Sequence, residues 1–118
     1  MSAHRVESFL CVRISPPNRV EVVRVARQEV DDSEDVVPSE AILASHSDVV
    51  ALYKLPHQWA RDDSISYPLN QIWKNSGPIG AHHESIHAVV YLVARRGVNE
   101  DFDSLTEAEI QACQHRLG

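Results

Sequence analysis

Apolar and polar residues alternate along the beginning of the chain. In residues 6–14 the even-numbered positions are apolar apart from Ser8, while the charged residues fall on odd-numbered positions. A period of two with one apolar side predicts a half-buried β-strand. Pro16, Pro17 and Asn18 then break the pattern, because proline cannot donate to a strand ladder and asparagine tolerates turn geometry. The valine-rich residues 19–30 are predicted to return as the second strand of a hairpin.

The next part of the chain carries weaker signals. Val22 and Val23 interrupt the alternation of the second strand, which predicts a bulge or burial on both faces. The acidic residues 31–35 lack the glycine and the ligand spacing of an EF-hand, so we expect a solvated loop. Ser39 is predicted to cap a short helix over residues 41–44. Residues 48–55 are predicted to form a third strand.

The middle and the end of the chain predict further helices. Residues 56–80 are rich in proline and glycine and contain both tryptophans, Trp59 and Trp73, which we expect to form a lid over the core. Residues 69–74 are predicted to form one or two helical turns, and residues 97–103 a polar connector. Thr106 and Glu109 have the spacing of a capping box. They predict a terminal helix whose buried side is marked by Leu105, Ile110 and Cys113 or Leu117.

The most specific chemical pattern in the chain is HESIH at residues 83–87, which fits H-E-x-x-H. If residues 81–96 form a helix, His83 and His87 lie one turn apart and can bind one zinc ion. Glu84 can then act on a metal-bound water. Arg95 and Arg96 would lie in the last turn of this helix, before Gly97.

The same region also fits a β-strand. Residues 88–94 are all apolar and include three valines and a tyrosine, which equally predicts a buried strand. Residues of a strand are about 3.3 Å apart, so one metal ion cannot bridge His83 and His87 in a strand. The sequence alone does not decide between a helix and a strand for this region.

Residues 81–97 resemble the active helix of zincin metalloproteases. The part from His83 onward is most similar to the family of FtsH-type metalloproteases, whose helix carries an HEAGHAVV-like run. This resemblance implies that His83 and His87 are zinc ligands and that Glu84 is the general base. Ile86 stands where that family has a glycine.

A catalytic zinc site needs a third protein ligand besides the two histidines. The resemblance implies an acidic residue on a later element, and we select Glu100 as this metal ligand. Residues 99–103, NEDFD, are faintly similar to the N-E-x-x-D motif of thermolysin-like enzymes, although the connection from His87 is short. The other candidates are Asp101, Asp103, Glu107, Glu109 and His115.

Composition places the chain among folded acidic proteins. Its 118 residues suit a single domain over residues 1–118, and 43% of them are hydrophobic, against 24% that are charged. The net charge of −6 argues against nucleic-acid or anionic-membrane partners. Cys11 and Cys113 have no metal or disulfide spacing, which favours free thiols. With no secretory signal and no apolar run long enough to span a bilayer, we expect a cytoplasmic protein.

Together these patterns predict an α+β fold, in which a small antiparallel sheet packs against two C-terminal helices. The sheet would consist of the N-terminal hairpin and the third strand. Two functions are compatible with it. The first is a small zinc-dependent hydrolase or peptidase of zincin type. The second is a non-catalytic protein–protein interaction module with structural histidines, such as a small regulator, inhibitor or adaptor of accessory or phage type. That module would bind a protein or peptide partner, or a second copy of itself, through the hairpin edge or the terminal helix.

Overall fold

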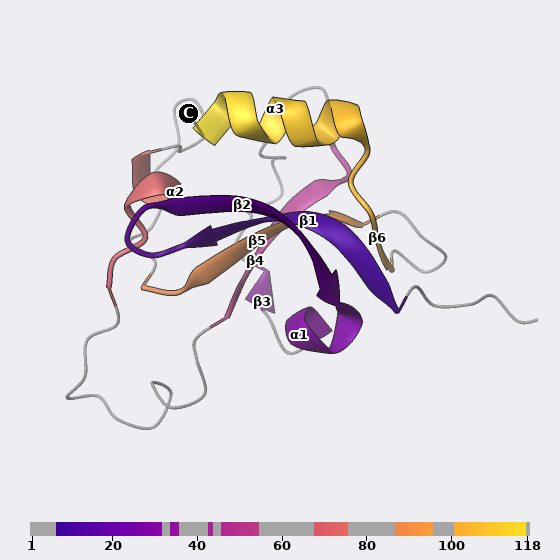
Figure 1. Ribbon diagram of the computed structural model, residues 1–118, viewed down its shortest axis with the longest axis horizontal. Helices are drawn as coiled ribbons and strands as arrows, with labels where there is room; N and C mark the ends of the chain where they lie inside the picture. The colour runs from indigo at the N-terminus through magenta and orange to yellow at the C-terminus, as the bar shows by residue number, and fades with distance from the viewer. Residues whose placement is uncertain are drawn as a thin grey trace, which may run out of the picture.

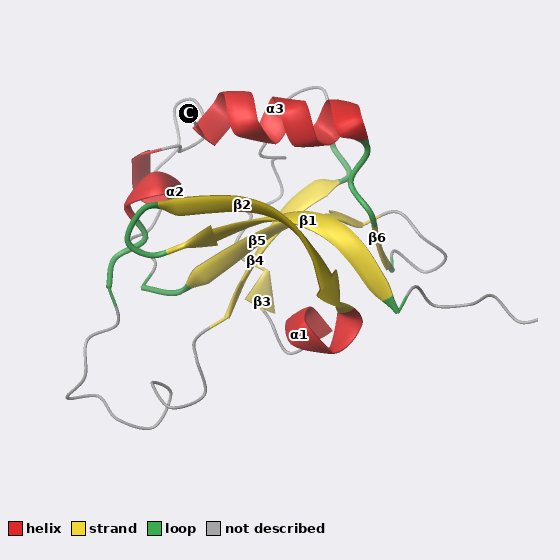
Figure 2. Cartoon of the chain, viewed as in Figure 1, coloured by secondary structure: helices red, strands yellow, loops and turns green. Residues whose placement is uncertain are grey.

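A six-stranded antiparallel sheet forms the centre of the protein (Figures 1 and 2). The computed structural model describes residues 7–31, 34–35, 43, 46–54, 68–75, 87–95 and 101–117. The strand order is β2-β1-β5-β4-β3, and β6 also pairs with β5. The strands are β1 (Ser8–Ser15), β2 (Arg19–Ala26), β3 (Glu34–Asp35), β4 (Val49–Lys54), β5 (Val89–Arg95) and β6 (Phe102–Asp103). The helices are α1 (Arg27–Asp31), α2 (Gln71–Asn75) and α3 (Glu107–Leu117).

The predicted hairpin is present, with two corrections. β1 and β2 pair without interruption from Ser8 opposite Ala26 to Ser15 opposite Arg19, so there is no bulge. The interrupted alternation at Val22 and Val23 instead reflects the position of β2 at the edge of the sheet, where Val22 is 40% exposed. The second strand ends at Ala26 rather than at residue 30, because residues 27–31 form α1.

β5 is a central strand, and the helix expected over residues 81–96 is therefore wrong for Val89–Arg95. The strand pairs with β4 on one side and with β1 and β6 on the other. Its middle residues are buried on both faces of the sheet. The valines and the tyrosine of this run suit such a position, because β-branched and aromatic side chains pack well on a pleated surface. The strand alternative is confirmed.

The sheet has two faces that are covered by different helices. On the first, which we call the α3 face, α2 and α3 cover a core that includes Val12, Ile14, Val90 and Leu92. On the opposite α1 face, a second cluster includes Phe9, Cys11, Val30, Tyr91 and Val93. Figure 1 shows α3 and α1 on opposite sides of the sheet. β1 is thus buried on both faces rather than on one.

β1 and β5 separate at one end, and the segment before α3 fills the gap. β1 pairs with β5 from Val12 to Ile14, whereas Ala94 and Arg95 pair with β6. The Leu10 amide donates to Ser104 Oγ over 3.0 Å, and the Leu105 amide donates to the Leu10 carbonyl over 3.0 Å. The predicted polar connector over residues 97–103 therefore ends in a short strand.

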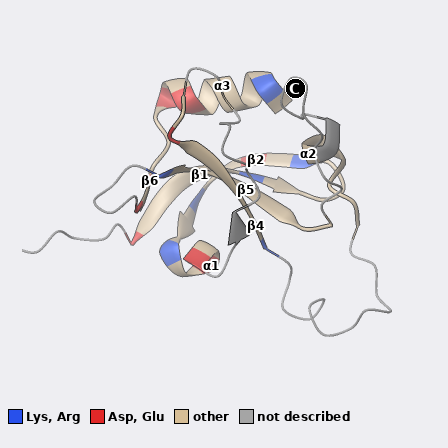
Figure 3. Ribbon diagram, turned by 180° about the vertical axis from the view of Figure 1, so that it is seen from behind, with Lys and Arg blue, Asp and Glu red and all other residues tan. Residues whose placement is uncertain are grey.

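α3 begins with the predicted capping box. The Thr106 amide donates to Glu109 Oε1 over 2.7 Å, and the Glu109 amide donates to Thr106 Oγ1 over 3.2 Å. Leu105 and Cys113 are buried against the α3 face. The first turn contains Glu107 and Glu109 and the last turn His115 and Arg116, the arrangement that suits the helix dipole; Figure 3 shows red near the start of α3 and blue near its end.

The remaining predictions are partly confirmed. β4 falls within the range expected for it, whereas α2 begins inside the expected range of residues 69–74 and ends one residue beyond it, at Asn75. The acidic run is not simply a solvated loop, because Glu34–Asp35 pairs with β4. Trp73 is part of the core and not a lid over it, while Trp59 and most of the short helix expected over residues 41–44 lie outside the described residues.

The fold class is α+β as predicted, and the described residues form one C-terminal helix, α3, where two were expected. In the described parts of the chain, no helix is long and apolar enough to cross a membrane.

Candidate functional site

Asn70 anchors the part of the sheet next to the predicted zinc motif. Its side chain is completely buried, and its Nδ2 donates to the Ile14 carbonyl over 2.9 Å and to the Ala88 carbonyl over 3.0 Å. Its Oδ1 accepts a hydrogen bond of 3.1 Å from the Trp73 amide, so Asn70 is also the N-cap of α2. Asn70 was not among the residues predicted from the sequence to have a role. An asparagine before a helix indicates a cap, but nothing local indicates the bonds to β1 and to the residue that precedes β5.

The predicted zinc site lies largely outside the described residues. His83, Glu84 and Glu100 are not among them, whereas His87 is exposed and directly precedes Ala88 and β5. Because Val89 already belongs to a strand, a helical turn carrying both histidines would have to end at about His87. Among the described residues there is no group of three histidine, cysteine or acidic side chains that could hold a metal ion.

The other candidates for the third zinc ligand take part in local structure or lie on the surface of α3. Asp101 is ion-paired with Arg27, a residue that is 5% exposed and whose guanidinium lies over the Phe102 ring. Asp103 Oδ1 accepts a hydrogen bond of 2.7 Å from the Ser104 amide, and Glu109 belongs to the capping box. The exposed candidates on α3 are Glu107 and His115.

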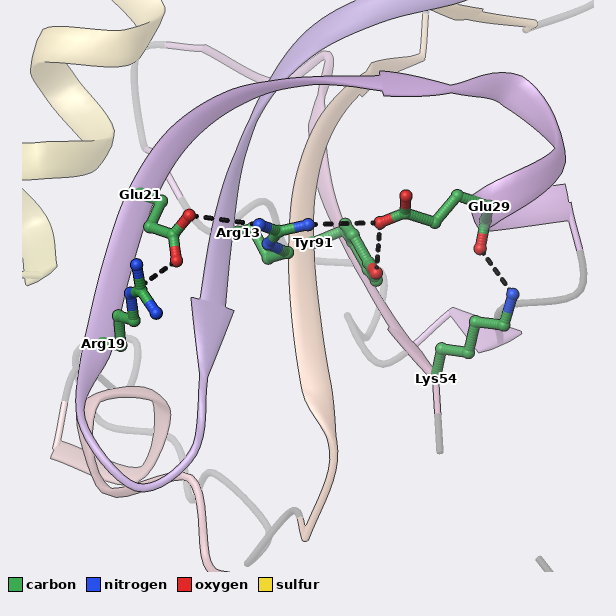
Figure 4. A network of polar contacts seen from close by, with 6 residues as sticks. All are labelled: Arg13, Arg19, Glu21, Glu29, Lys54 and Tyr91. Carbon is green, nitrogen blue, oxygen red and sulfur yellow. Dashed lines mark hydrogen bonds and ion pairs between the residues drawn. The ribbon is translucent and has the colours of Figure 1, made fainter. Parts of the chain in front are cut away.

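A polar network crosses the α1 face of the sheet (Figure 4). Arg13 Nη2 lies 3.1 Å from Glu21 Oε2, and Arg13 Nη1 lies 3.5 Å from Glu29 Oε2. The Tyr91 hydroxyl donates to the same Glu29 oxygen over 2.6 Å, and Lys54 Nζ donates to the Glu29 carbonyl over 2.7 Å. The strand register produces this row, since Arg13 is opposite both Glu21 and Tyr91. The network attaches α1 to four strands.

The groups in and near this network are poorly suited to nucleophilic chemistry. Burial, and then the nearby Glu29 carboxylate, raise the pKa of the Cys11 thiol to about 12. Burial, the hydrogen bond to Glu29 and its charge also raise the pKa of the Tyr91 hydroxyl. On the other face, burial and the Glu109 carboxylate raise the pKa of Cys113 to about 12. At neutral pH these groups stay protonated, and a thiol is a far weaker nucleophile than a thiolate.

The open edge of β2 is the feature of the described structure that can contact another molecule through the backbone. Alternate residues of a strand direct their amide and carbonyl groups to opposite sides. The Arg27 amide donates to the Glu7 carbonyl over 2.8 Å, whereas both backbone groups of Leu10 bond away from β2. In the hairpin, therefore, the backbone amide and carbonyl groups of the odd-numbered residues of β1 and β2 bond to each other. The outward groups on β2 belong to Val20, Val22 and Arg24.

The two edges of the sheet differ in length and chemistry. β3, at one edge, has two residues, both acidic, and short charged strands discourage pairing with other chains. β2, at the other edge, has eight residues and contains neither proline nor lysine. In the described part of the structure β1 is the strand that pairs with β2. The edge of β2 is thus a template for strand addition.

No protein family, curated protein or solved structure matches the chain.

Proposed function

We propose that the protein is a non-catalytic protein–protein interaction module that accepts an extended segment of a partner protein beside β2. The observation that carries this proposal is the eight-residue edge strand with the outward backbone groups of Val20, Val22 and Arg24. Strand addition to an exposed sheet edge is a common way to bind peptides, because main-chain hydrogen bonds supply affinity and alternate side chains supply specificity.

The energetics favour this use of the edge. Each outward residue offers one backbone donor and one acceptor, and a hydrogen bond formed there contributes about 1 kcal/mol net. Val22 adds apolar surface, since this residue of the same strand is 40% exposed. An added strand would cover that side chain and extend the sheet.

Val22→Pro is the variant that tests the proposal. Proline removes the outward amide of residue 22, while the odd-numbered residues keep their bonds to β1, so an edge strand tolerates the change. Val22→Thr is the matched control, because threonine keeps both the amide and the branched shape. The probe is a random-peptide phage library selected on the wild-type protein. We expect selected peptides to bind the wild type and the threonine variant about equally, and the proline variant about tenfold more weakly.

Two results would contradict the proposal. One is that the library yields no specific binder. The other is that the selected peptides bind the proline variant as well as they bind the wild type, which would locate the binding surface elsewhere. Circular dichroism and the thermal midpoint of the proline variant establish that it is folded before binding is compared.

A zinc-dependent hydrolase or peptidase of zincin type is the second proposal, supported by the HESIH pattern and by the exposure of His87. In it, His83, His87 and Glu100 hold Zn²⁺, and Glu84 is the general base. The test is the metal content of protein purified without chelators, followed by Glu84→Gln. The proposal predicts about one zinc ion per chain and loss of hydrolysis in the variant, and less than about a tenth of an ion per chain would refute it.

A reducing compartment such as the cytoplasm suits either proposal. Cys11 and Cys113 are both free and buried, and they lie in clusters on opposite faces of the sheet. Proteins of oxidising compartments more often pair their cysteines. Fractionation of the source cells tests this location.

A further inference from the structure

We infer that the segment bound at β2 carries a carboxylate opposite Arg24 and an apolar side chain opposite Val22. This inference rests on the proposed strand addition and specifies the chemistry of the partner. Because Val22 and Arg24 are two residues apart, the partner motif is an acidic residue and an apolar residue separated by one residue of any type.

This motif follows from the face of the sheet on which the side chains of Val22 and Arg24 lie. Arg24 pairs with Leu10 and Val22 with Val12, and Val12 belongs to the core of the α3 face. Residues opposite each other on paired strands project from the same face of the sheet. A residue opposite Val22 in an added strand would therefore cover its exposed apolar surface, and the residue opposite Arg24 would lie beside the guanidinium.

Among the described residues, Arg24 is the cation of β2 that forms no ion pair with a carboxylate. Arg13 and Arg19 both form ion pairs with Glu21, at 3.1 Å and 2.6 Å. Arg24 is exposed, and its Nη1 donates to the neutral Ser8 hydroxyl over 3.3 Å. Within the described structure, β2 thus presents a positive charge that is left for a partner to neutralise, in a protein whose net charge is −6.

A second copy of the chain fits this edge poorly. In a twofold pairing of β2 with itself that continues the sheet, the outward even-numbered residues face even-numbered residues of the other copy. Glu21 is the acidic residue of β2, and it lies on the opposite face from Arg24. No such register places a carboxylate opposite Arg24, so a different chain with an acidic residue is the better occupant.

The test uses synthetic nine-residue peptides with blocked ends and threonine at the remaining positions. One has the core Glu-Thr-Val-Thr-Val, a second has the reversed order Val-Thr-Val-Thr-Glu, and each has a counterpart with lysine in place of glutamate. The order that binds identifies an antiparallel or a parallel partner. We expect one glutamate peptide to bind about fivefold more tightly than its lysine counterpart, since an opposite-charge cross-strand pair is replaced by a like-charge pair.

The variants Arg24→Gln and Arg24→Glu separate local from global charge. Arg24→Gln should remove most of the preference for glutamate, and Arg24→Glu should reverse it in favour of lysine. Gln111→Glu is the control, because it changes the net charge by the same amount as Arg24→Gln at an exposed position of α3. It should leave the preference unchanged.

The outcomes distinguish this inference from the function on which it rests. Equal binding of glutamate and lysine peptides, with binding still lost in Val22→Pro, would overturn the acidic motif and leave strand addition standing. A glutamate preference that persists in Arg24→Glu would also overturn it. If none of these peptides binds and the phage library yields no ligand dependent on the residue 22 amide, both fail.

Discussion

The Tyr91 hydroxyl donates a hydrogen bond of 2.6 Å to Glu29 Oε2 and thereby joins the central strand β5 to α1. The same carboxylate oxygen lies 3.5 Å from Nη1 of Arg13, which belongs to β1. One acidic side chain therefore connects both β1 and β5 to α1. α1 continues directly from β2, and this contact therefore determines where the end of the edge strand is held.

Tyr91→Phe should lower the free energy of unfolding by about 1 to 2 kcal/mol, because it removes a hydrogen bond to a charged group that is partly exposed. Urea unfolding followed by circular dichroism measures the change. Glu29→Gln is the companion variant, and the double variant should lose less than the sum of the two single changes. Fully additive losses would show that the two side chains act independently.

Alkaline pH should destabilise the protein through its thiols. Burial raises the pKa of Cys11 and Cys113 from 9.0 to about 12, so between these values the unfolded chain loses protons that the folded protein keeps. The free energy of unfolding should then fall as the pH rises from 9 towards 12, by about 1.4 kcal/mol per pH unit for each thiol. The stabilisation is complete below pH 9.

Urea unfolding at several alkaline pH values checks this slope. The doubly substituted protein with Cys11→Ala and Cys113→Ala should show a distinctly flatter dependence than the wild type, although it is less stable at neutral pH. Tyr91 contributes in the same direction and keeps part of the slope in both proteins. Identical slopes would mean that the thiols ionise equally in the folded and unfolded states.

Asn70→Ala should be among the most damaging single substitutions in the described structure. It leaves the buried Ile14 and Ala88 carbonyls without their amide donor and removes the cap of α2. We expect a loss of about 3 kcal/mol, from two lost buried hydrogen bonds and the lost cap together. The neighbouring exposed residue offers the control Gln71→Ala, which should change the free energy of unfolding by less than about 0.5 kcal/mol.

Much of the fold follows from local patterns in the sequence. β1 and β4 were predictable because strand periodicity and flanking prolines are local, and α3 because Thr106 and Glu109 form a capping box. β5 was ambiguous because an apolar run fits a buried helix or a buried strand until its neighbours β1 and β4 are known. The short strands β3 and β6 exist through tertiary pairing and carry no pattern of their own.

The candidate site was less accessible from the sequence than the fold. The interrupted alternation at Val22 and Val23 marked β2 as an irregular strand. Its position at the edge of the sheet, however, depends on the strand order. The outward direction of the Val22 and Arg24 backbone depends on which residues of β1 and β2 bond to each other. Asn70 likewise acts through strands that are distant in the sequence.

Amide hydrogen exchange, measured by NMR with and without a peptide selected on the wild-type protein, tests the central claim most directly. Strand addition at β2 predicts that the amides of Val20, Val22 and Arg24 become protected when the peptide binds. The amides of Glu21 and Val23, which already face β1, should change little. Protection that leaves Val22 and Arg24 unchanged and appears on α3 or on the α1 face would contradict the account.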